Sequence, residues 1–218
     1  MHCLGGRVLK PEILDTLSYD QARASLADLT RLNRRWGGHS TLRRLLRDAV
    51  HAPEFSLLDV GAASGDMGNC VRQWYPKARV TSLDRIAFHL AASPPPRVAG
   101  DAFALPFREK SFDFVFCSLF LHHFTDTEIV RLLAGFGAVA RTAVLVIDLE
   151  RNPIAYYFVP WTQWIFGWDP VTVNDAAISV EAAFHPRELE ALAARAGLQH
   201  PRARSYRPAF RIAMIAKP

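Results

Sequence analysis

Cysteine is scarce in this chain, and its few cysteines are not spaced like metal ligands. The 218 residues contain three, Cys3, Cys70 and Cys117. An odd number at such wide separations argues against a disulfide framework and against a zinc site, whose cysteines come in closely spaced pairs. This pattern favours a reducing compartment, and we therefore predict a cytoplasmic protein that holds no metal.

Long apolar runs and runs of positive charge are also missing. Charged residues at Arg7, Lys10, Glu12 and Asp15 interrupt the N-terminal segment, so no signal peptide is visible. The net charge is +5, but the basic residues are mostly single arginines rather than the Lys/Arg clusters that follow a phosphate backbone. We expect neither a nucleic-acid partner nor stable insertion into a membrane.

The chain does have enough apolar material for one domain with a full-sized core, since 50% of its residues are hydrophobic. Residues 1–52 are predicted to form a helical extension. Ser18 and Gln21 have the spacing of a capping box, Gly37-Gly38 stops the pattern, and a second helix follows. The extension is predicted to pack on the domain for stability or to form part of a lid. The residues expected on its apolar faces are Ala22, Leu26, Leu29, Leu32, Leu42, Leu45, Leu46 and Ala49.

The most informative segment is residues 57–68, LLDVGAASGDMG. It predicts a buried strand that carries an acid, Asp59, near its end, then a loop of small residues and the start of a helix. Gly61 and Gly65 lack side chains and let backbone amides approach a ligand, and the helix directs its N-terminus to the same place. This pattern is typical of a pocket for a nucleotide-sized ligand. Dinucleotide-binding enzymes share it, and some such turns bind nothing.

Three later segments sharpen that interpretation. Residues 78–84 predict a second strand ending in Asp84, whose carboxylate can accept hydrogen bonds from both hydroxyls of a ribose. In residues 100–107, Asp101 can accept from an adenine amino group while apolar neighbours enclose the ring. Residues 111–124 predict a further strand and then a loop that faces the pocket.

In their order and residue pattern, these four segments resemble the class I S-adenosylmethionine-dependent methyltransferases. The resemblance extends from roughly Phe55 to the C-terminus. The stretch GDAFALPF…SFDFVFCSLFLHHF is most similar to members that act on small molecules such as quinones, polyketides and other secondary metabolites. The resemblance implies S-adenosylmethionine as cofactor and S-adenosylhomocysteine as product. One departure is Ala63, which replaces the usual middle glycine of the loop and narrows the space for the methionine moiety. The cofactor-binding residues implied are Asp59, Gly61, Ala63, Gly65, Asp84, Asp101, Ala102 and Ser118.

The fold predicted for residues 53–218 is a Rossmann-like α/β domain, in which a seven-stranded, mostly parallel sheet carries helices on both faces. Residues 142–147 are apolar and rich in β-branched side chains, as in a strand covered on both sides. The other elements predicted are helices from Thr125 and from Pro186 to Ala196, and two last strands around residues 198–206 and 209–216, whose antiparallel pairing the resemblance implies.

Residues 152–184 form an aromatic-rich insertion after the fifth strand, which we predict caps the substrate. Its apolar run is too short to span a bilayer, which takes ~20 residues, and each buried indole nitrogen would need a partner. Ordinary packing and a wall around a flat, lipophilic acceptor are equally open, with Tyr157, Trp161 and Trp164 as the substrate-binding residues. A surface that touches a membrane or a carrier protein is a third alternative.

The reaction implied is transfer of a methyl group from a sulfonium to a nucleophile. For this reaction the protein contributes positioning and, for a phenol or enol, removal of a proton. His122 and His123 adjoin the cofactor motifs, and the pKa of a histidine suits a base near neutrality; the alternative is that they pack as neutral rings. Asp175 is a third catalytic candidate, against the alternative of a solvated loop carboxylate. The lower-ranked candidates are Asp148, Asn174 and His185.

Two other functional classes stay open. An NAD-dependent oxidoreductase would share the first turn and Asp84, but the chain has neither a Tyr-x-x-x-Lys pair nor a zinc-ligand set to handle a hydride. A non-catalytic protein that only binds the cofactor is made conceivable by Ala63. The leading prediction is O- or C-methylation of a small, aromatic or lipophilic acceptor by a monomer or homodimer.

Overall fold

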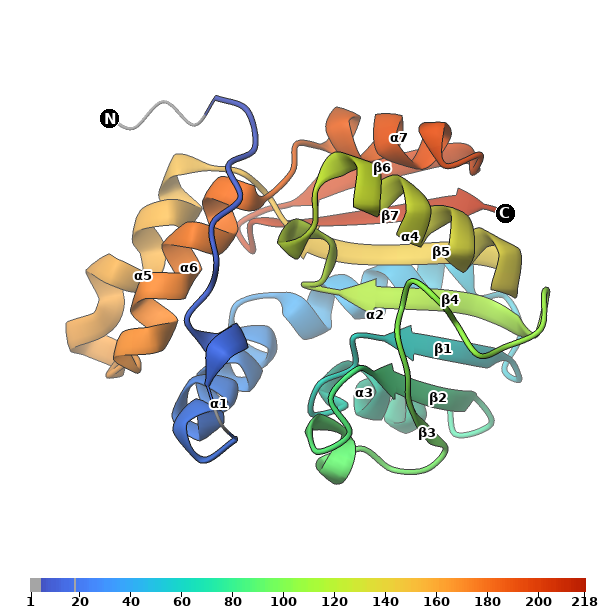
Figure 1. Ribbon diagram of the computed structural model, residues 1–218, viewed down its shortest axis with the longest axis horizontal. Helices are drawn as coiled ribbons and strands as arrows, with labels where there is room; N and C mark the ends of the chain where they lie inside the picture. The colour runs from blue at the N-terminus through green and yellow to red at the C-terminus, as the bar shows by residue number, and fades with distance from the viewer. Residues whose placement is uncertain (1–4, 18) are drawn as a thin grey trace.

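A single seven-stranded sheet organises the molecule. The computed structural model describes residues 5–17 and 19–218 (Figure 1). The strands lie in the order β3-β2-β1-β4-β5-β7-β6. Neighbouring strands are parallel except for β7, which runs antiparallel to β5 and β6. The predicted α/β fold is confirmed, with a mixed sheet. The strands are β1 (Ser56–Val60), β2 (Arg79–Asp84), β3 (Arg97–Ala99), β4 (Phe112–Ser118), β5 (Ala140–Leu149), β6 (Gln199–Tyr206) and β7 (Arg211–Lys217).

Helices cover both faces of the sheet and also its edge at the carboxyl ends of the parallel strands. The α-helices are α1 (Tyr19–Arg35), α2 (Gly38–Ala49), α3 (Asp66–Trp74), α4 (Asp126–Val139), α5 (Pro153–Phe166), α6 (Pro170–Ala182) and α7 (Pro186–Arg195). The short 3-10 helices are η1 (Leu14–Thr16), η2 (His89–Ala92) and η3 (Leu121–His123). In Figure 1, α2 and α3 lie on one face and α4 and α7 on the other, while α1, α5 and α6 gather where the parallel strands end.

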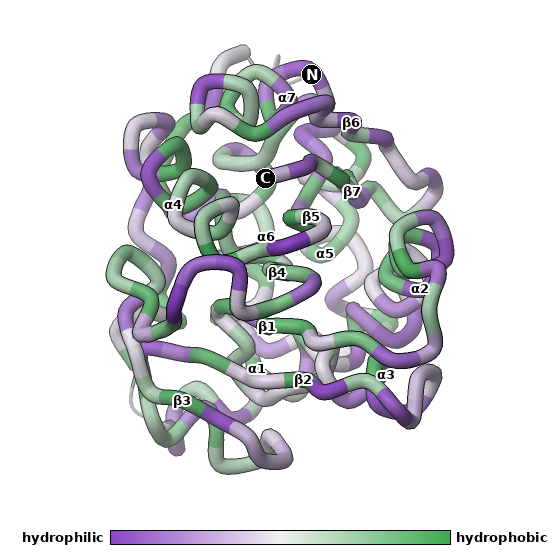
Figure 2. Tube along the Cα trace, turned by 90° about the vertical axis from the view of Figure 1, so that its right-hand side faces the viewer, coloured by the Kyte–Doolittle hydropathy of each residue, from purple (hydrophilic) through white to green (hydrophobic). Residues whose placement is uncertain are grey.

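The core has two layers because side chains alternate along each strand. On β1, Leu58 and Val60 pack with α4 and α7, whereas Leu57 packs with α2 and α3. On β4, Val115 belongs to the first layer and Phe116 to the second. Figure 2 shows the hydrophobic stretches of the strands in the interior of the molecule. Both faces are buried, which explains why the strands read as continuous apolar runs.

Several predicted helix boundaries are confirmed. Helix α4 begins with a capping box in which Thr125 and Glu128 bond each other's backbone amides. Helix α7 ends before Gly197, whose φ of +84° is the left-handed conformation that glycine adopts at helix ends. The capping box predicted at Ser18 involves a residue outside the described part of the chain. Cys70 and Cys117 are buried free thiols.

The aromatic segment after β5 folds as two helices joined by a tight turn. Helix α5 starts with an Asn152 cap followed by Pro153, and it ends at Gly167 with a φ of +61°. Helix α6 starts in the same way, because the Asp169 carboxylate accepts from the Val171 amide. Among the described residues, no helix is long and apolar enough to cross a membrane.

The segment 5–17 runs as a strap along α6 (Figure 1). The Val8 amide donates to the carbonyl of Glu181 at 3.1 Å. The Asp175 carboxylate accepts from the amides of Ile13 and Leu14 at 3.0 and 2.9 Å. These bonds bring Glu12, which lies between the two contacts, to the interior of the molecule.

Candidate functional site

A cavity of about 790 Å³ lies at the carboxyl ends of the parallel strands, which is the edge where open α/β sheets bind ligands. One side is built from the loops that follow β1, β2, β3 and β4. The other side is built from the strap and from α1, α5 and α6. Of the residues predicted for the site, those lining the cavity are Gly61, Ala63, Asp84, Asp101, Ala102, His122, His123 and Asp175.

The loop after β1 is held in an unusual backbone conformation. Gly61 has a φ of +68°, and a Cβ built on it would come within 2.5 Å of the Phe120 ring. Gly65 has a φ of +73° and precedes the N-terminus of α3. Ala63 also lies in the left-handed region, with a φ of +45°, although it has a side chain. This conformation costs a non-glycine residue roughly 1–2 kcal/mol, so the loop keeps a shape that a glycine would adopt more easily.

Asp84 ties this loop to the end of β2. Its carboxylate accepts from the Ala63 amide at 2.9 Å and from the Ile86 amide at 2.9 Å. The side chain also lines the cavity, and each carboxylate oxygen has a second lone pair. Asp84 can therefore accept from ribose hydroxyls while it holds the loop in place.

The third loop supplies a polar group beside a flat apolar surface. Asp101 accepts from the Phe103 amide at 2.9 Å, and Ile86, Ala102 and Phe103 line the same cavity. The Phe103 ring also packs edge-on against Phe124, with 5.5 Å between the ring centroids. These residues suit an aromatic base with an amino group at its edge.

Three residues predicted to bind the cofactor lie outside the cavity lining. Gly65 faces Ser93 instead. Asp59 is buried beneath α3, and this burial raises the pKa of its carboxyl group to about 7. The charge of Asp84 also raises this pKa, whereas Arg72 and the Gly68 amide lower it. The Oγ of Ser118 is buried without a hydrogen-bond partner among the described residues. These residues support the loops from behind rather than from the cavity side.

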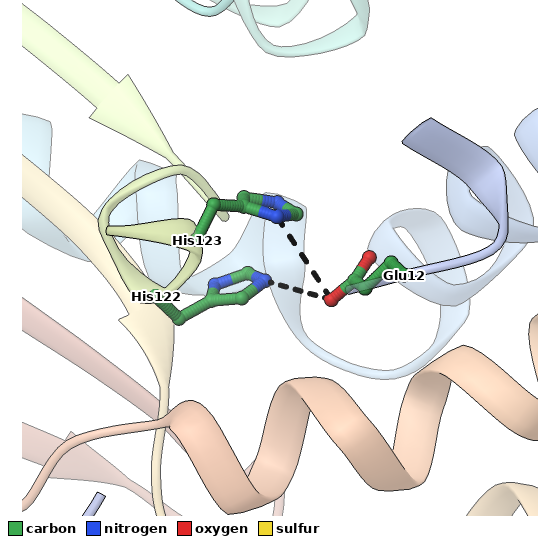
Figure 3. Close-up of side chains that lie close together, drawn as sticks. All are labelled: Glu12, His122 and His123. Atoms are coloured by element: carbon green, nitrogen blue, oxygen red, sulfur yellow. Dashed lines mark ion pairs between the residues drawn. The ribbon is translucent and has the colours of Figure 1, made fainter. Parts of the chain in front are cut away.

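His122 and His123 lie on η3, directly after β4, and point toward Glu12 of the strap (Figure 3). His122 is 4% exposed. Its Nδ1 lies 2.6 Å from Oδ1 of Asp148, and its Nε2 lies 3.6 Å from Oε1 of Glu12. Burial lowers the pKa of His122, but the charges and hydrogen bonds of Asp148 and Glu12 outweigh burial and raise it to about 10. His122 is therefore already protonated near neutral pH and cannot accept a proton there.

His123 has the more accessible imidazole of the two. Its side chain is 27% exposed, and its Nδ1 lies 4.0 Å from Oε1 of Glu12. The two rings lie close together, with 4.3 Å between their centroids. Both histidines line the cavity, and the greater exposure of the His123 side chain makes it the one that a bound acceptor can reach.

Glu12 is the site residue that sequence reasoning missed. It is 8% exposed and accepts a hydrogen bond from the Ser179 hydroxyl. Burial raises its pKa, but the hydrogen bond and charge of His122, together with His123 and Ser179, produce a net decrease. A single glutamate far along the chain from its partners carries no local signal, so only the folded strap reveals it.

Asp175 lines the cavity as predicted, but its carboxylate is already engaged. In addition to the two strap amides, it accepts from Nδ2 of Asn174 at 2.8 Å. Its position therefore matches the prediction, while its contacts are those of a residue that fixes the strap.

The structure does not bring the predicted aromatic residues to the cavity. Trp161 and Trp164 are 74% and 90% exposed, and Tyr157 stacks on Trp161 at 4.9 Å. Helix periodicity explains this, because these three positions share one face of α5 and the cavity lies on the opposite face. The apolar or aromatic residues that line the cavity from α1, from Trp36 just after it, and from α5 are Ala22, Leu26, Leu29, Leu32, Trp36, Ala155, Phe158 and Val159.

Comparison with known proteins agrees with this geometry. Residues 58–141 match the family model described as "Methyltransferase domain". Demethylmenaquinone methyltransferases of Roseiflexus sp. (strain RS-1) and Roseiflexus castenholzii (strain DSM 13941 / HLO8) are each 30% identical over 159 residues. These alignments cover 64% of this chain, and the chain spans 66% of the length of each relative.

Solved structures share the fold at low sequence identity. Human N-acetylserotonin methyltransferase in complex with SAM has a TM-score of 0.66 and 19% identity, with 96% of this chain and 60% of that chain covered. The plantazolicin methyltransferase BpumL in complex with SAH has a TM-score of 0.67 and 14% identity, with 91% and 90% covered.

The cavity suits the cofactor of this fold. The predicted cofactor residues lie in one row along the ends of adjacent strands. The row runs from the left-handed loop residues Gly61 and Ala63, past the carboxylate of Asp84, to Ala102. This order matches a methionine moiety, a ribose and an adenine in turn. Residues 58–141 form a methyltransferase domain, and the sheet and the row of loops are those of the class I S-adenosylmethionine-dependent methyltransferase fold.

Proposed function

We propose that this protein transfers a methyl group from S-adenosylmethionine to an oxygen or a ring carbon of a lipophilic, aromatic acceptor. The observation that carries the proposal is the shape of the cavity. One continuous space joins the cofactor loops to an apolar compartment walled by Leu29, Phe158 and Val159, with His123 lining the same space. The name of the curated relatives, demethylmenaquinone methyltransferase, supports a quinone-like acceptor.

S-adenosylmethionine supplies an activated methyl group, so the protein chiefly has to position the acceptor and manage one proton. Asp84 and Asp101 orient the cofactor. The apolar walls orient a flat acceptor and exclude water. His123 takes the proton of a phenolic or enolic hydroxyl at a ring nitrogen, because His122 is already protonated. Removing that proton raises the electron density on the oxygen and on the adjacent ring carbon alike.

The segments around the cavity have distinct roles in this proposal. Residues 1–52 supply part of a cover, since the strap and α1 line the cavity, whereas α2 packs on the sheet. Residues 152–184 cap the acceptor through the inner face of α5 and through α6. The protein acts as a monomer or homodimer in the cytoplasm and needs no nucleic acid.

The direct test is binding followed by turnover. S-adenosylhomocysteine should raise the melting temperature of the purified protein and NAD should not, because a ligand that binds only the folded state stabilises it. A demethylated naphthoquinol should then accept a labelled methyl group from S-adenosylmethionine, with a polar catechol of the same acidity as the control. A shift with NAD alone would favour the oxidoreductase, which the family match does not favour. Cofactor binding without transfer to any phenol or quinol would indicate a non-catalytic binding protein.

A further inference from the structure

Three side chains of types that are common metal ligands in proteins converge at the edge of the cavity. Glu12, His122 and His123 each direct one ligand atom to a common point, and these atoms all lie within 4.8 Å of one another. Figure 3 shows both imidazoles turned toward the same carboxylate oxygen. Two imidazoles and one carboxylate are a recurring ligand set for divalent transition metals whose remaining positions stay open.

Neighbouring groups hold these three ligands in place through hydrogen bonds. His122 is held at Nδ1 by Asp148, so Nε2 is the nitrogen that faces Glu12. A carboxylate bound to the far nitrogen of a histidine is the usual outer partner of a metal ligand, because it fixes the ring and raises its basicity. Asp148 is itself fixed by the amides of Leu121 and Leu149, at 3.0 and 2.8 Å. Ser179 orients Glu12 in the same way.

The spacing is close to what an ion requires. Metal–nitrogen bonds of about 2.0–2.1 Å place neighbouring ligands of a tetrahedral ion ~3.3 Å apart. Oε1 of Glu12 lies 3.6 Å from Nε2 of His122 and 4.0 Å from Nδ1 of His123. The two imidazole nitrogens lie within 4.8 Å of each other, so a movement of about 1 Å, mostly by the partly exposed His123, closes the site.

An ion at this point would be accessible on two sides. The three ligands line the main cavity, and they also line a second cavity of about 250 Å³ beneath the strap. The second cavity provides a route for the ion to enter. The main cavity provides an open position for an oxygen of the acceptor.

We propose that Glu12, His122 and His123 bind one divalent transition-metal ion, which displaces the proton from Nε2 of His122. Asp148 is the outer partner of His122. In the metal-loaded protein His123 is a ligand, so the ion takes over the role that His123 has as a base in the metal-free protein. The hydroxyl oxygen of the acceptor would occupy the open position, where the ion lowers the pKa of the hydroxyl and the proton leaves to solvent. This role for the ion rests on the proposed methyl transfer, whereas binding of the ion does not.

Calorimetry on the full chain tests the site without any turnover. Protein stripped with a chelator is titrated with ZnCl₂, and we expect one ion per chain. Glu12→Gln and His123→Ala should abolish this binding, and Asp148→Asn should weaken it by about 10–100-fold. Circular dichroism confirms that each variant is folded, and thermal shifts with ZnCl₂ provide a second measurement.

The chain supplies its own control, because His39, Asp66 and Cys70 form the other group of potential ligands among the described residues. His39→Gln should leave the binding intact. The site is wrong if stripped protein binds no zinc, if Glu12→Gln and His123→Ala bind it normally, or if His39→Gln removes it. Methyl transfer by stripped protein before and after reloading tests the role of the ion, and equal rates would overturn that role. A protein that binds zinc but never methylates any acceptor would overturn the proposed function and leave the site standing.

Discussion

The two sides of the cavity are built by different means. On the cofactor side, each functional group follows a strand directly, and neighbouring strands place Gly61, Asp84 and Asp101 side by side. On the acceptor side, the groups come from segments far apart in the chain. Glu12 meets His122 because the strap is fastened to α6 at Asp175 and at Glu181.

This difference shows which functional residues can be predicted from the local sequence. A strand-to-loop motif contains both the ligand-binding group and the structure that positions it, so the sheet fixes its place as soon as it forms. A helix that covers the cavity is positioned only by packing. Its residues can therefore face the cavity or the solvent at equal cost in local conformation.

The largest effect on turnover is expected when the side chain of His123, on the acceptor side, is removed. We expect His123→Ala to lower turnover on a weakly acidic phenol by ~10²–10⁴, while the affinity for S-adenosylhomocysteine stays nearly constant. The defect should shrink for an acceptor that is already ionised at the assay pH. His51→Ala, which changes an exposed loop histidine, is the control. Full turnover of the His123 variant would show that the histidine has no part in the reaction.

The corresponding challenge to the cofactor side is Asp84→Ala. Loss of the charge-assisted bonds to ribose should cost about 1.5–3 kcal/mol, an order of magnitude or more in the affinity for S-adenosylhomocysteine. The loop amide of Ala63 also loses its acceptor. Calorimetry measures the change, with the exposed Asp48→Ala as a matched control. An unchanged dissociation constant would contradict the position assigned to the ribose.

The sequence predicted the fold and most of the cofactor side for the same physical reason. Apolar strands, a capping box at Thr125 and left-handed glycines such as Gly197 are local patterns, and each of them appears in the structure. Glu12 gave no such signal, because nothing near it in the chain marks it as buried. Trp161 was expected at the cavity from composition alone, and composition does not say which face of a helix points inward.

The pH dependence of the free energy of unfolding tests the buried Asp59, which does not face the cavity. The pKa of Asp59 is about 7 in the folded protein, above its value of about 3.9 when unfolded. Between these values the folded state binds more protons, so stability falls as pH rises from about 4 to 7. Asp59→Asn lacks this effect and should gain about 2–3 kcal/mol in free energy of unfolding relative to wild type between pH 5 and pH 8.

Urea unfolding of both proteins at the two pH values measures the difference. The variant should also bind S-adenosylhomocysteine nearly as well as wild type, since Asp59 does not line the cavity. A parallel pH dependence in the two proteins would show that Asp59 ionises normally.

The strained loop offers a smaller test of the cofactor side. Ala63→Gly should raise stability by about 0.5–1 kcal/mol, because glycine removes the cost of the left-handed conformation and repays only part of it in chain entropy. It should also tighten cofactor binding, since the methyl group no longer narrows the loop. Ala62→Gly changes a neighbour that lacks a positive φ, so this control should be destabilised. A loss of stability in both variants would mean that Ala63 carries no strain.

The smallest effect is expected on the outer face of α5. Trp164 is 90% exposed, so Trp164→Ala should alter the free energy of unfolding by less than about 0.5 kcal/mol and leave acceptor use unchanged. Phe158 lines the cavity on the opposite face, so Phe158→Ala should raise the KM for the acceptor while cofactor affinity is preserved. Steady-state kinetics on both variants compares the two faces of one helix directly. If Trp164→Ala raises the KM for the acceptor without loss of stability, the exposed rings contact the acceptor, and the contrast between the two sides of the cavity no longer extends to this helix.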